Sequence, residues 1–144
     1  TNHTSVTYNS SGTSTYVNIS NLTATLSGSS EYVINCDLIT SANLVGTGER
    51  IRINTTGTPA IVSWSFNSQV SATTRTSFSG NNTATNSFAD TGSAGTIVPD
   101  DTIIIGYIKT NGGASTVTYQ LYSELANNNT WVERGSRCTY IKVA

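Results

Sequence analysis

The sequence predicts an all-β fold, a jelly-roll sandwich of about eight to ten antiparallel strands. Short apolar runs alternate with polar residues, which is the period of a half-buried strand and not of a helix. Turn signals containing Gly, Pro or Asn separate these runs at short intervals. The 144 residues suffice for one domain with its own hydrophobic core.

The composition excludes several classes of partner. Charged residues make up only 10% of the chain, with a formal net charge of -1, whereas ordinary soluble domains carry about 25%. Such a chain offers no basic surface for nucleic acid or for an anionic membrane. No apolar run approaches the ~20 residues of a membrane-spanning helix. We therefore expect neither a nucleic-acid partner nor membrane insertion.

The first residues differ from the rest of the chain. Residues 1–15 are polar and rich in turn formers, and we expect them to be an arm or linker that leads in from a region upstream. Residues 16–144 then form the sandwich domain. Its first strand is expected at about Tyr16 to Leu26, and Gly28 to Ser30 turn the chain.

Three strands with clear alternation follow. The first covers residues 31–40 and has the apolar face Tyr32, Ile34, Cys36 and Leu38. The second alternates Ile51 and Ile53 with Arg50 and Arg52. The third follows a turn at Thr56 to Pro59 and has the apolar face Ala60, Val62, Trp64 and Phe66.

From Asn67 to Gly95 no sustained period is present. Short strands are expected at about Thr73 to Ser79 and Thr83 to Ala89, with a turn at Gly80 to Asn82. Loops carried on a rigid sheet are where binding residues usually lie. The residues expected to bind a ligand here are Arg75, Phe78, Asn81 and Asn82.

One strand is apolar on both faces, because Ile103, Ile104 and Ile105 are consecutive. In a solitary two-sheet sandwich one face of each strand meets water. Either a loop covers the second face or another copy of the chain does, and we predict a second copy because contiguous apolar patches usually mark interfaces. The predicted interface residues are Ile103, Ile104, Ile105, Tyr107, Tyr122 and Tyr140.

The last quarter of the chain, Val117 to Val143, predicts two final strands separated by a polar loop. Asn111-Gly112-Gly113 indicates a tight hairpin. The returning strand places Val117, Tyr119 and Leu121 on one face, and we expect Tyr119, Leu121 and Ile141 to complete the core. Tyr122 and Tyr140 would then face outward.

The two cysteines are predicted to be free thiols. Cys36 shares a face with Ile34 and Leu38, whereas Cys138 shares a face with Tyr140 and alternates with Ile141. The two cysteines could form one disulfide or none. If the strands that carry them are neighbours, the thiols point to opposite faces of the sheet, which would forbid a bond.

No stretch carries catalytic chemistry. The only histidine, His3, lies in the expected arm, whereas a Ser-His or Cys-His site needs an oriented imidazole. The neighbouring Asp100 and Asp101 follow Pro99 and are more typical of a turn than of a glycosidase pair. Zinc and nucleotide motifs are lacking. We expect a protein that is not an enzyme and that uses no cofactor or metal.

Three pieces of sequence occur in a characteristic order. They are Glu31-Tyr32-Val33-Ile34, the turn Thr56 to Pro59, and Tyr122-Ser123-Glu124-Leu125 followed by Gly135-Ser136 and a short apolar strand. This order, over about Tyr16 to Val143, resembles the C-terminal head domains of bacteriophage tail-fibre and virion proteins. Those domains are similar in fold to the trimeric jelly rolls of the tumour-necrosis-factor (TNF) and complement-head superfamily.

The resemblance implies a TNF-like homotrimer at the virion surface, in contact with other virion proteins. It implies host attachment through a surface glycan or protein receptor, or capsid decoration. Ser123-Glu124 and Gly135-Ser136 fall where the family closes its last two strands, and the two cysteines are not part of its pattern. The alternatives are a secreted monomeric carbohydrate-binding module and a bacterial adhesin domain with an isopeptide bond from Lys109 or Lys142.

Overall fold

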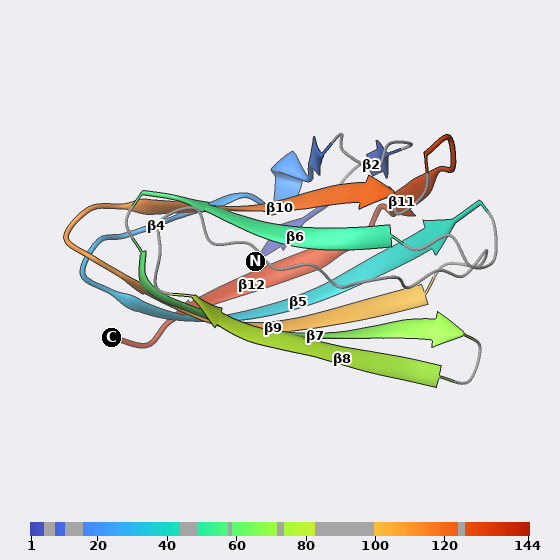
Figure 1. The fold of residues 1–144 in the computed structure, drawn as a ribbon. Helices are drawn as coiled ribbons and strands as arrows, with labels where there is room; N and C mark the ends of the chain where they lie inside the picture. Colours follow the sequence, from blue (N-terminus) through green and yellow to red (C-terminus); the bar gives the residue numbers. More distant parts are fainter. Residues whose placement is uncertain are drawn as a thin grey trace.

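The computed structural model describes residues 1–4, 8–10, 16–43, 49–57, 59–71, 74–82, 100–123 and 126–144. Within these residues an eight-stranded and a four-stranded sheet pack face to face, and every strand pair is antiparallel (Figure 1). The predicted all-β jelly-roll sandwich is therefore confirmed.

The strands are β1 (Asn2–His3), β2 (Tyr8–Ser10), β3 (Val17–Asn18), β4 (Ala24–Leu26), β5 (Glu31–Ala42), β6 (Glu49–Thr56), β7 (Pro59–Ser71), β8 (Thr74–Asn82), β9 (Asp100–Thr110), β10 (Ser115–Ser123), β11 (Thr130–Val132) and β12 (Arg137–Lys142). A 3-10 turn, Ser20–Leu22, separates β3 from β4, so the single strand predicted at Tyr16 to Leu26 is divided into two.

The larger sheet has the order β1-β12-β5-β9-β7-β8, and β11 continues the edge next to β5 and pairs with β2. In the smaller sheet β10 lies between β6 on one side and β3 and β4 on the other. Strands that follow one another in the sequence, such as β4 and β5 or β6 and β7, belong to different sheets. The chain therefore crosses repeatedly between the two layers.

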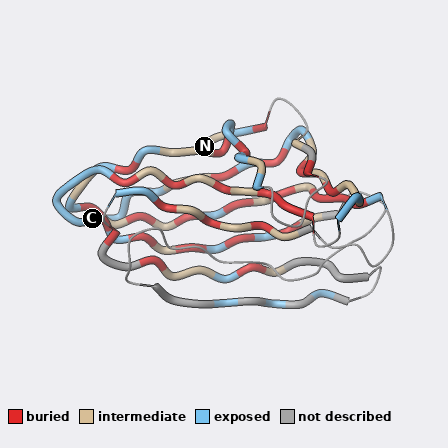
Figure 2. The backbone as a smooth tube through the Cα atoms, turned by 45° about the horizontal axis from the view of Figure 1, so that its top comes forward, coloured by how far each residue is buried: buried red, intermediate tan, exposed pale blue. Residues whose placement is uncertain are grey.

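The core lies between the sheets, and buried residues alternate with exposed ones along the strands (Figure 2). The predicted apolar face of β5 is buried, as are Ile51 and Ile53 of β6 and Val117, Tyr119 and Leu121 of β10. On β7, Val62 and Phe66 are buried and Trp64 packs against them. Because a strand has a period of two, alternation in the sequence identified these inward faces.

The connection Asn111 to Gly113 is not the hairpin that the sequence predicted. Its flanking strands β9 and β10 lie in different sheets and do not pair in the described residues. At this end of the sandwich it packs against the turn between β4 and β5, where an added Cβ on Gly28 would lie 2.4 Å from the Gly112 carbonyl oxygen. The glycines serve a close approach of two backbones as well as a turn.

The described part of the predicted N-terminal arm belongs to the larger sheet. Asn2 and His3 pair with Cys138 and Arg137, and β2 pairs with β11. Thr4 is buried, and its hydroxyl donates to the Glu133 carbonyl over 2.9 Å. Residues 2–4 and 8–10 are thus held against the sandwich, although their polar side chains gave no sign of this backbone pairing.

The described part of the segment expected to be loop-like, residues 67–71 and 74–82, belongs to two paired strands. Strands β7 and β8 pair from Val62 and Asn82 to Ser71 and Thr74, so the turn predicted at Gly80 to Asn82 lies inside a strand. The strand expected at Thr83 to Ala89 falls outside the described residues. Because β7 also pairs with β9 along most of its length, backbone hydrogen bonds hold a segment whose side chains show no period.

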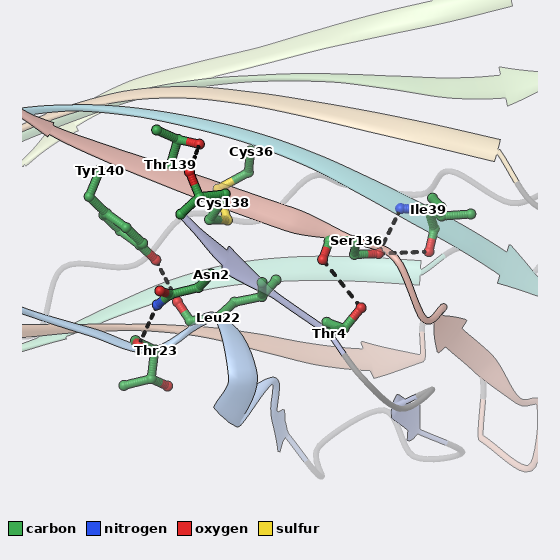
Figure 3. The surroundings of a disulfide bond; sticks show 11 residues. Asn2, Thr4, Leu22, Thr23, Cys36, Ile39, Ser136, Cys138, Thr139 and Tyr140 are labelled. Carbon is green, nitrogen blue, oxygen red and sulfur yellow. Dashed lines mark hydrogen bonds between the residues drawn. A yellow bond between two sulfur atoms is a disulfide. The ribbon is translucent and has the colours of Figure 1, made fainter.

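The prediction of free thiols is wrong. Cys36 and Cys138 stand directly opposite each other on β5 and β12 and are joined by a disulfide (Figure 3). Cys138 does share a face with Tyr140, as the alternation indicated, but that face points inward. Ile141 is 47% exposed, so it does not complete the core as predicted.

Gly135 and Ser136 form the turn into the last strand. Gly135 has a φ of +99°, which a residue with a side chain rarely adopts. The Ser136 hydroxyl accepts from the Ile39 N–H at 2.9 Å and donates to the Glu133 carbonyl at 2.8 Å. This turn therefore fixes the start of β12 against β5.

Candidate functional site

The outer face of the larger sheet carries a row of exposed apolar residues on its central strand β9. Ile103 is 40% exposed and Ile105 is 55% exposed, while Ile104 between them is fully buried in the core. Tyr107 continues the row and is partly exposed. We call this region, with the residues beside it on β5 and β12, the β9 face.

Strand register shows how the β9 face is built. Val33 of β5 lies opposite Tyr107 of β9 and opposite Ile141 of β12. Ile105 lies between Asn35 of β5 and Ser65 of β7. Residues directly opposite each other share a face of the sheet. The side chains of Val33, Tyr107 and Ile141, which come from three adjacent strands, therefore form one apolar patch. Ile105 has uncharged polar neighbours on both sides, whereas Ile103 lies opposite Asp37 of β5.

Ion pairs stand at both ends of the β9 face. Lys109 Nζ lies 2.8 Å from Glu31 Oε1 at one end, and Arg137 Nη2 lies 3.0 Å from Asp37 Oδ2 at the other. The hydrogen bond from Lys109, followed by one from Tyr107, lowers the pKa of Glu31. The hydrogen bond to Glu31 in turn raises the pKa of Lys109. The charges at the edge of the patch are therefore paired within the chain.

Two shallow hollows flank the row of isoleucines. One of about 530 Å³ lies between β9 and β7, and its walls include Ile105, Tyr107 and the serines Ser63, Ser65 and Ser79. The other, of about 590 Å³, lies between β9 and β12, and its walls include Ile103, Asn35 and Thr139. Ile103 and Ile105 thus lie between two depressions on the same face.

The predicted interface residues do not all lie on the same surface. Ile103, Ile105 and Tyr107 lie together on the β9 face. Ile104 is in the core, and Tyr122 is only 4% exposed on the other sheet. Tyr140 points inward and donates its hydroxyl to the Leu22 carbonyl (Figure 3).

Val33 and Ile141 were not among the predicted interface residues, and Ile141 was expected in the core. The signal was present, because both alternate with residues of the core face. The assumption that apolar Ile141 must point inward reversed the orientation of the last strand.

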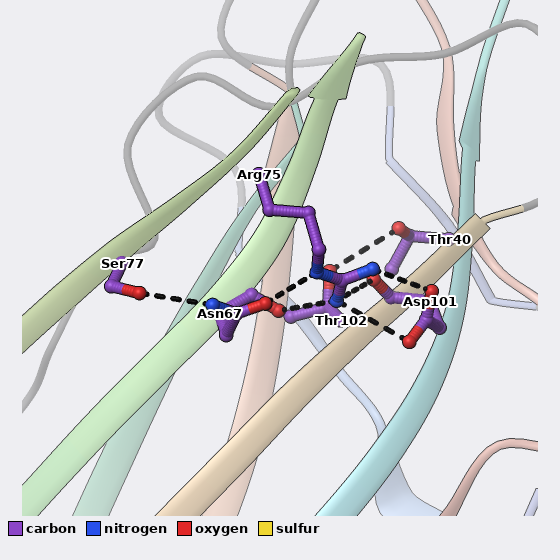
Figure 4. Close-up of polar contacts among 6 residues, drawn as sticks. All are labelled: Thr40, Asn67, Arg75, Ser77, Asp101 and Thr102. Atoms are coloured by element: carbon purple, nitrogen blue, oxygen red, sulfur yellow. Dashed lines mark hydrogen bonds and ion pairs between the residues drawn. The ribbon is translucent and has the colours of Figure 1, made fainter. Parts of the chain in front are cut away.

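Arg75, predicted to bind a ligand, holds three strands together (Figure 4). Its Nη1 donates to Asp101 Oδ1 of β9 at 2.8 Å, Nη2 donates to the Asn67 carbonyl of β7 at 3.0 Å, and Nε donates to the Asn67 side chain. The guanidinium therefore has a structural use at the end of the sheet. Phe78, Asn81 and Asn82 lie in β8, and their side chains fall outside the described part of the chain.

Within the described ranges no three His, Cys, Asp or Glu side chains come close enough to hold a metal ion. In the same part of the chain no helix has the length and apolar character needed to cross a membrane.

Comparison with known proteins gives no family. No family description matches the chain, and no curated protein matches it. Among solved structures, the infectious bursal disease virus VP2 subviral particle aligns at 12% identity over 96% of this chain and 37% of that chain, with a TM-score of 0.30. The infectious bursal disease virus Gx strain aligns at 14% identity over 97% and 38%, with a TM-score of 0.24. The chain spans under two fifths of either protein, and TM-scores of this size do not establish a shared fold.

Proposed function

We propose that this chain is a head domain of a bacteriophage virion protein, which forms a homotrimer through the β9 face and serves in host attachment or capsid decoration. The order of sequence pieces that resembles phage head domains supports the assignment to a virion protein. The exposed Ile103 and Ile105 on the central strand of a sheet support the assembly, and this observation carries the proposal.

The composition of the β9 face fits a second copy of the chain. Interface centres are depleted in charge and rich in apolar residues, and they are surrounded by a polar rim. Here the centre holds Ile105, Tyr107 and Ile141, while the paired charges Glu31–Lys109 and Asp37–Arg137 stand at the rim. A partner of opposite charge has nothing to pair with at this centre, whereas an identical uncharged patch fits it.

Light scattering on the purified chain tests the assembly. A trimer has three times the chain mass of 15.2 kDa. A mass near 15.2 kDa at micromolar concentration would overturn the proposed trimer. A trimer that survives Ile105→Asp and Ile103→Asp together would show that the interface lies elsewhere.

Binding to cells tests the role. An attachment domain binds whole host bacteria, and a decoration protein binds capsids and ignores cells. Both assays use the trimer that light scattering establishes. A chain that binds neither cells nor capsids would contradict the virion role.

The second candidate function is a secreted monomeric carbohydrate-binding module. The observation that favours it is the hollow between β7 and β9, whose walls include the aromatic residue Tyr107 and the serines Ser63, Ser65 and Ser79. Aromatic rings and hydroxyls are suited to sugars. This candidate requires a monomer with an open β9 face, so the light-scattering result decides between the two.

In the adhesin alternative Lys109 would have to give up its ion pair with Glu31 to form the isopeptide bond. An isopeptide bond from Lys109 or Lys142 would lower the intact mass of the chain by the mass of one ammonia, so mass spectrometry tests this alternative.

A further inference from the structure

The outer face of the smaller sheet carries a second group of aromatic and charged residues, far from the β9 face because the core separates the two. Arg50 lies opposite Tyr122 in the β6–β10 pairing. Arg52, two residues further on, lies opposite Gln120, which in turn lies opposite Asn18 of β3. Arginine, tyrosine and amide side chains therefore share one face.

Ring and guanidinium contacts join four of these residues. The Tyr16 ring lies edge-on to the Tyr122 ring, with centroids 4.7 Å apart. The Arg52 guanidinium carbon lies 4.5 Å from the Tyr16 centroid. The Arg50 guanidinium carbon lies 5.8 Å from the Tyr122 centroid, and its Nη1 donates to the Tyr122 hydroxyl at 3.3 Å. We call Tyr16, Arg50, Arg52 and Tyr122 the arginine–tyrosine cluster.

The cluster contains one buried and one exposed tyrosine. Tyr122 is 4% exposed, whereas Tyr16 is 40% exposed. Cation–π contacts hold guanidinium groups against these rings, so the cluster orders its own side chains before any ligand arrives. Ordering in advance lowers the entropy lost on binding.

The cluster carries two guanidinium groups, and uncharged amide side chains border it. Gln120 Nε2 donates to Asn18 Oδ1 at 2.8 Å beside Arg52, so an amide pair with further donors and acceptors borders the guanidinium. Each guanidinium has five N–H donors and can add a ligand to the contacts that it already makes.

We propose that the arginine–tyrosine cluster binds a carboxylated sugar of a surface polysaccharide. Arg52 receives the sugar carboxylate, because the guanidinium fork matches a carboxylate in geometry and charge. The exposed part of the Tyr16 ring packs against the apolar face of the pyranose, and Gln120 and Asn18 bond its hydroxyls. The proposal names the ligand class of the attachment role proposed above, on which it rests, yet it uses the residues of one chain only.

The test is calorimetric titration of the whole chain with a galacturonic acid trisaccharide and with 3′-sialyllactose, against the neutral galactose trisaccharide and lactose. At least one acidic sugar binds, its affinity falls as NaCl is raised, and its neutral counterpart binds more than about tenfold more weakly, as expected for the loss of a charge-assisted hydrogen bond. Arg52→Gln and Tyr16→Ala each lower the affinity for the acidic sugar by about tenfold or more.

Arg134→Gln is the matched control, because Arg134 is an exposed arginine in the turn before β12 and lies outside the cluster. It leaves binding unchanged. Binding by neither acidic sugar overturns the proposal. So does equal binding of acidic and neutral sugars, or unchanged binding by an Arg52→Gln protein whose thermal midpoint matches the wild type.

The monomeric Ile105→Asp protein separates this inference from the proposed assembly. It should bind the acidic sugar with wild-type affinity per chain, because the cluster lies within one protomer. Loss of the trimer with sugar binding retained leaves the sugar site standing, and a trimer without sugar binding leaves the assembly standing.

Discussion

Cys36 and Cys138 are directly opposite residues of β5 and β12, and their disulfide closes a sequence separation of 102 residues. Both side chains are almost fully buried. A link across so long a loop restricts the unfolded chain and contributes about 4 to 5 kcal/mol by the chain-entropy relation. The position ties the last strand of the chain to a central strand of the larger sheet.

We expect reduction to lower the free energy of unfolding by about 4 kcal/mol. Urea titrations of the oxidised protein with and without dithiothreitol measure the difference. The Cys36→Ala/Cys138→Ala protein serves as the control, since its unfolding should not respond to the reductant. Two titratable thiols in the unreduced, denatured protein would contradict the disulfide.

Replacement by aspartate is expected to have different effects at two adjacent isoleucines of β9, Ile104 and Ile105. Ile105→Asp places a charge on the exposed β9 face, so it should give a folded monomer with a far-ultraviolet circular dichroism spectrum like that of the wild type. Ile104→Asp places an unpaired carboxylate in the core, and an unpaired buried charge costs several kcal/mol. That protein should not fold. A folded Ile104→Asp protein would contradict the assignment of the core face.

Much of the inward face could be predicted because alternation is local information. The pattern from Tyr32 to Leu38 identified the inner side of β5, and Val117 to Leu121 identified that of β10. The isoleucines at 103 to 105 also marked the strand with an apolar outer face. None of these conclusions required knowledge of which strands pair.

What could not be predicted depends on pairing between distant segments. Asn2 and His3 carry no strand signal, and only the edge of β12 makes them a strand. The disulfide depended on the orientation of the last strand, where two exposed apolar residues, Ile141 and Val143, suggested the wrong inward face. The arginine–tyrosine cluster was missed because Tyr16 and Tyr122 are far apart in sequence and meet only through β3 and β10.

The turn at Gly28 packs closely against the turn at Gly112, although no strand pairing joins them. A Cβ at Gly28 would lie 2.4 Å from the Gly112 carbonyl oxygen, a backbone atom that cannot move alone. We expect Gly28→Ala to destabilise the protein by about 1–3 kcal/mol, the usual cost of overpacking. Gly113→Ala is the control, because an added Cβ there meets nothing within 4 Å. Equal thermal midpoints for the two variants would argue against the close approach of the two turns.

The last prediction concerns alkaline stability and the inward phenols of Tyr119 and Tyr140. Burial, and then the neighbouring Tyr140, raises the pKa of Tyr119 well above its usual value near 10. Burial likewise raises the pKa of Tyr140. In the unfolded chain both phenols lose their protons near pH 10, whereas the folded protein retains them. The stability that they contribute is therefore complete below pH 10 and is lost as pH rises above it.

The free energy of unfolding should fall above pH 10 by up to about 1.4 kcal/mol per pH unit for each phenol. Urea unfolding between pH 8 and 11.5 measures this slope. Tyr119→Phe should remove about half of it and the Tyr119→Phe/Tyr140→Phe protein most of it. Tyr140→Phe also loses the hydrogen bond to the Leu22 carbonyl, so its stability at pH 8 should be lower by about 1 kcal/mol. A double variant with the wild-type slope would assign the alkaline loss to the exposed lysines and tyrosines instead.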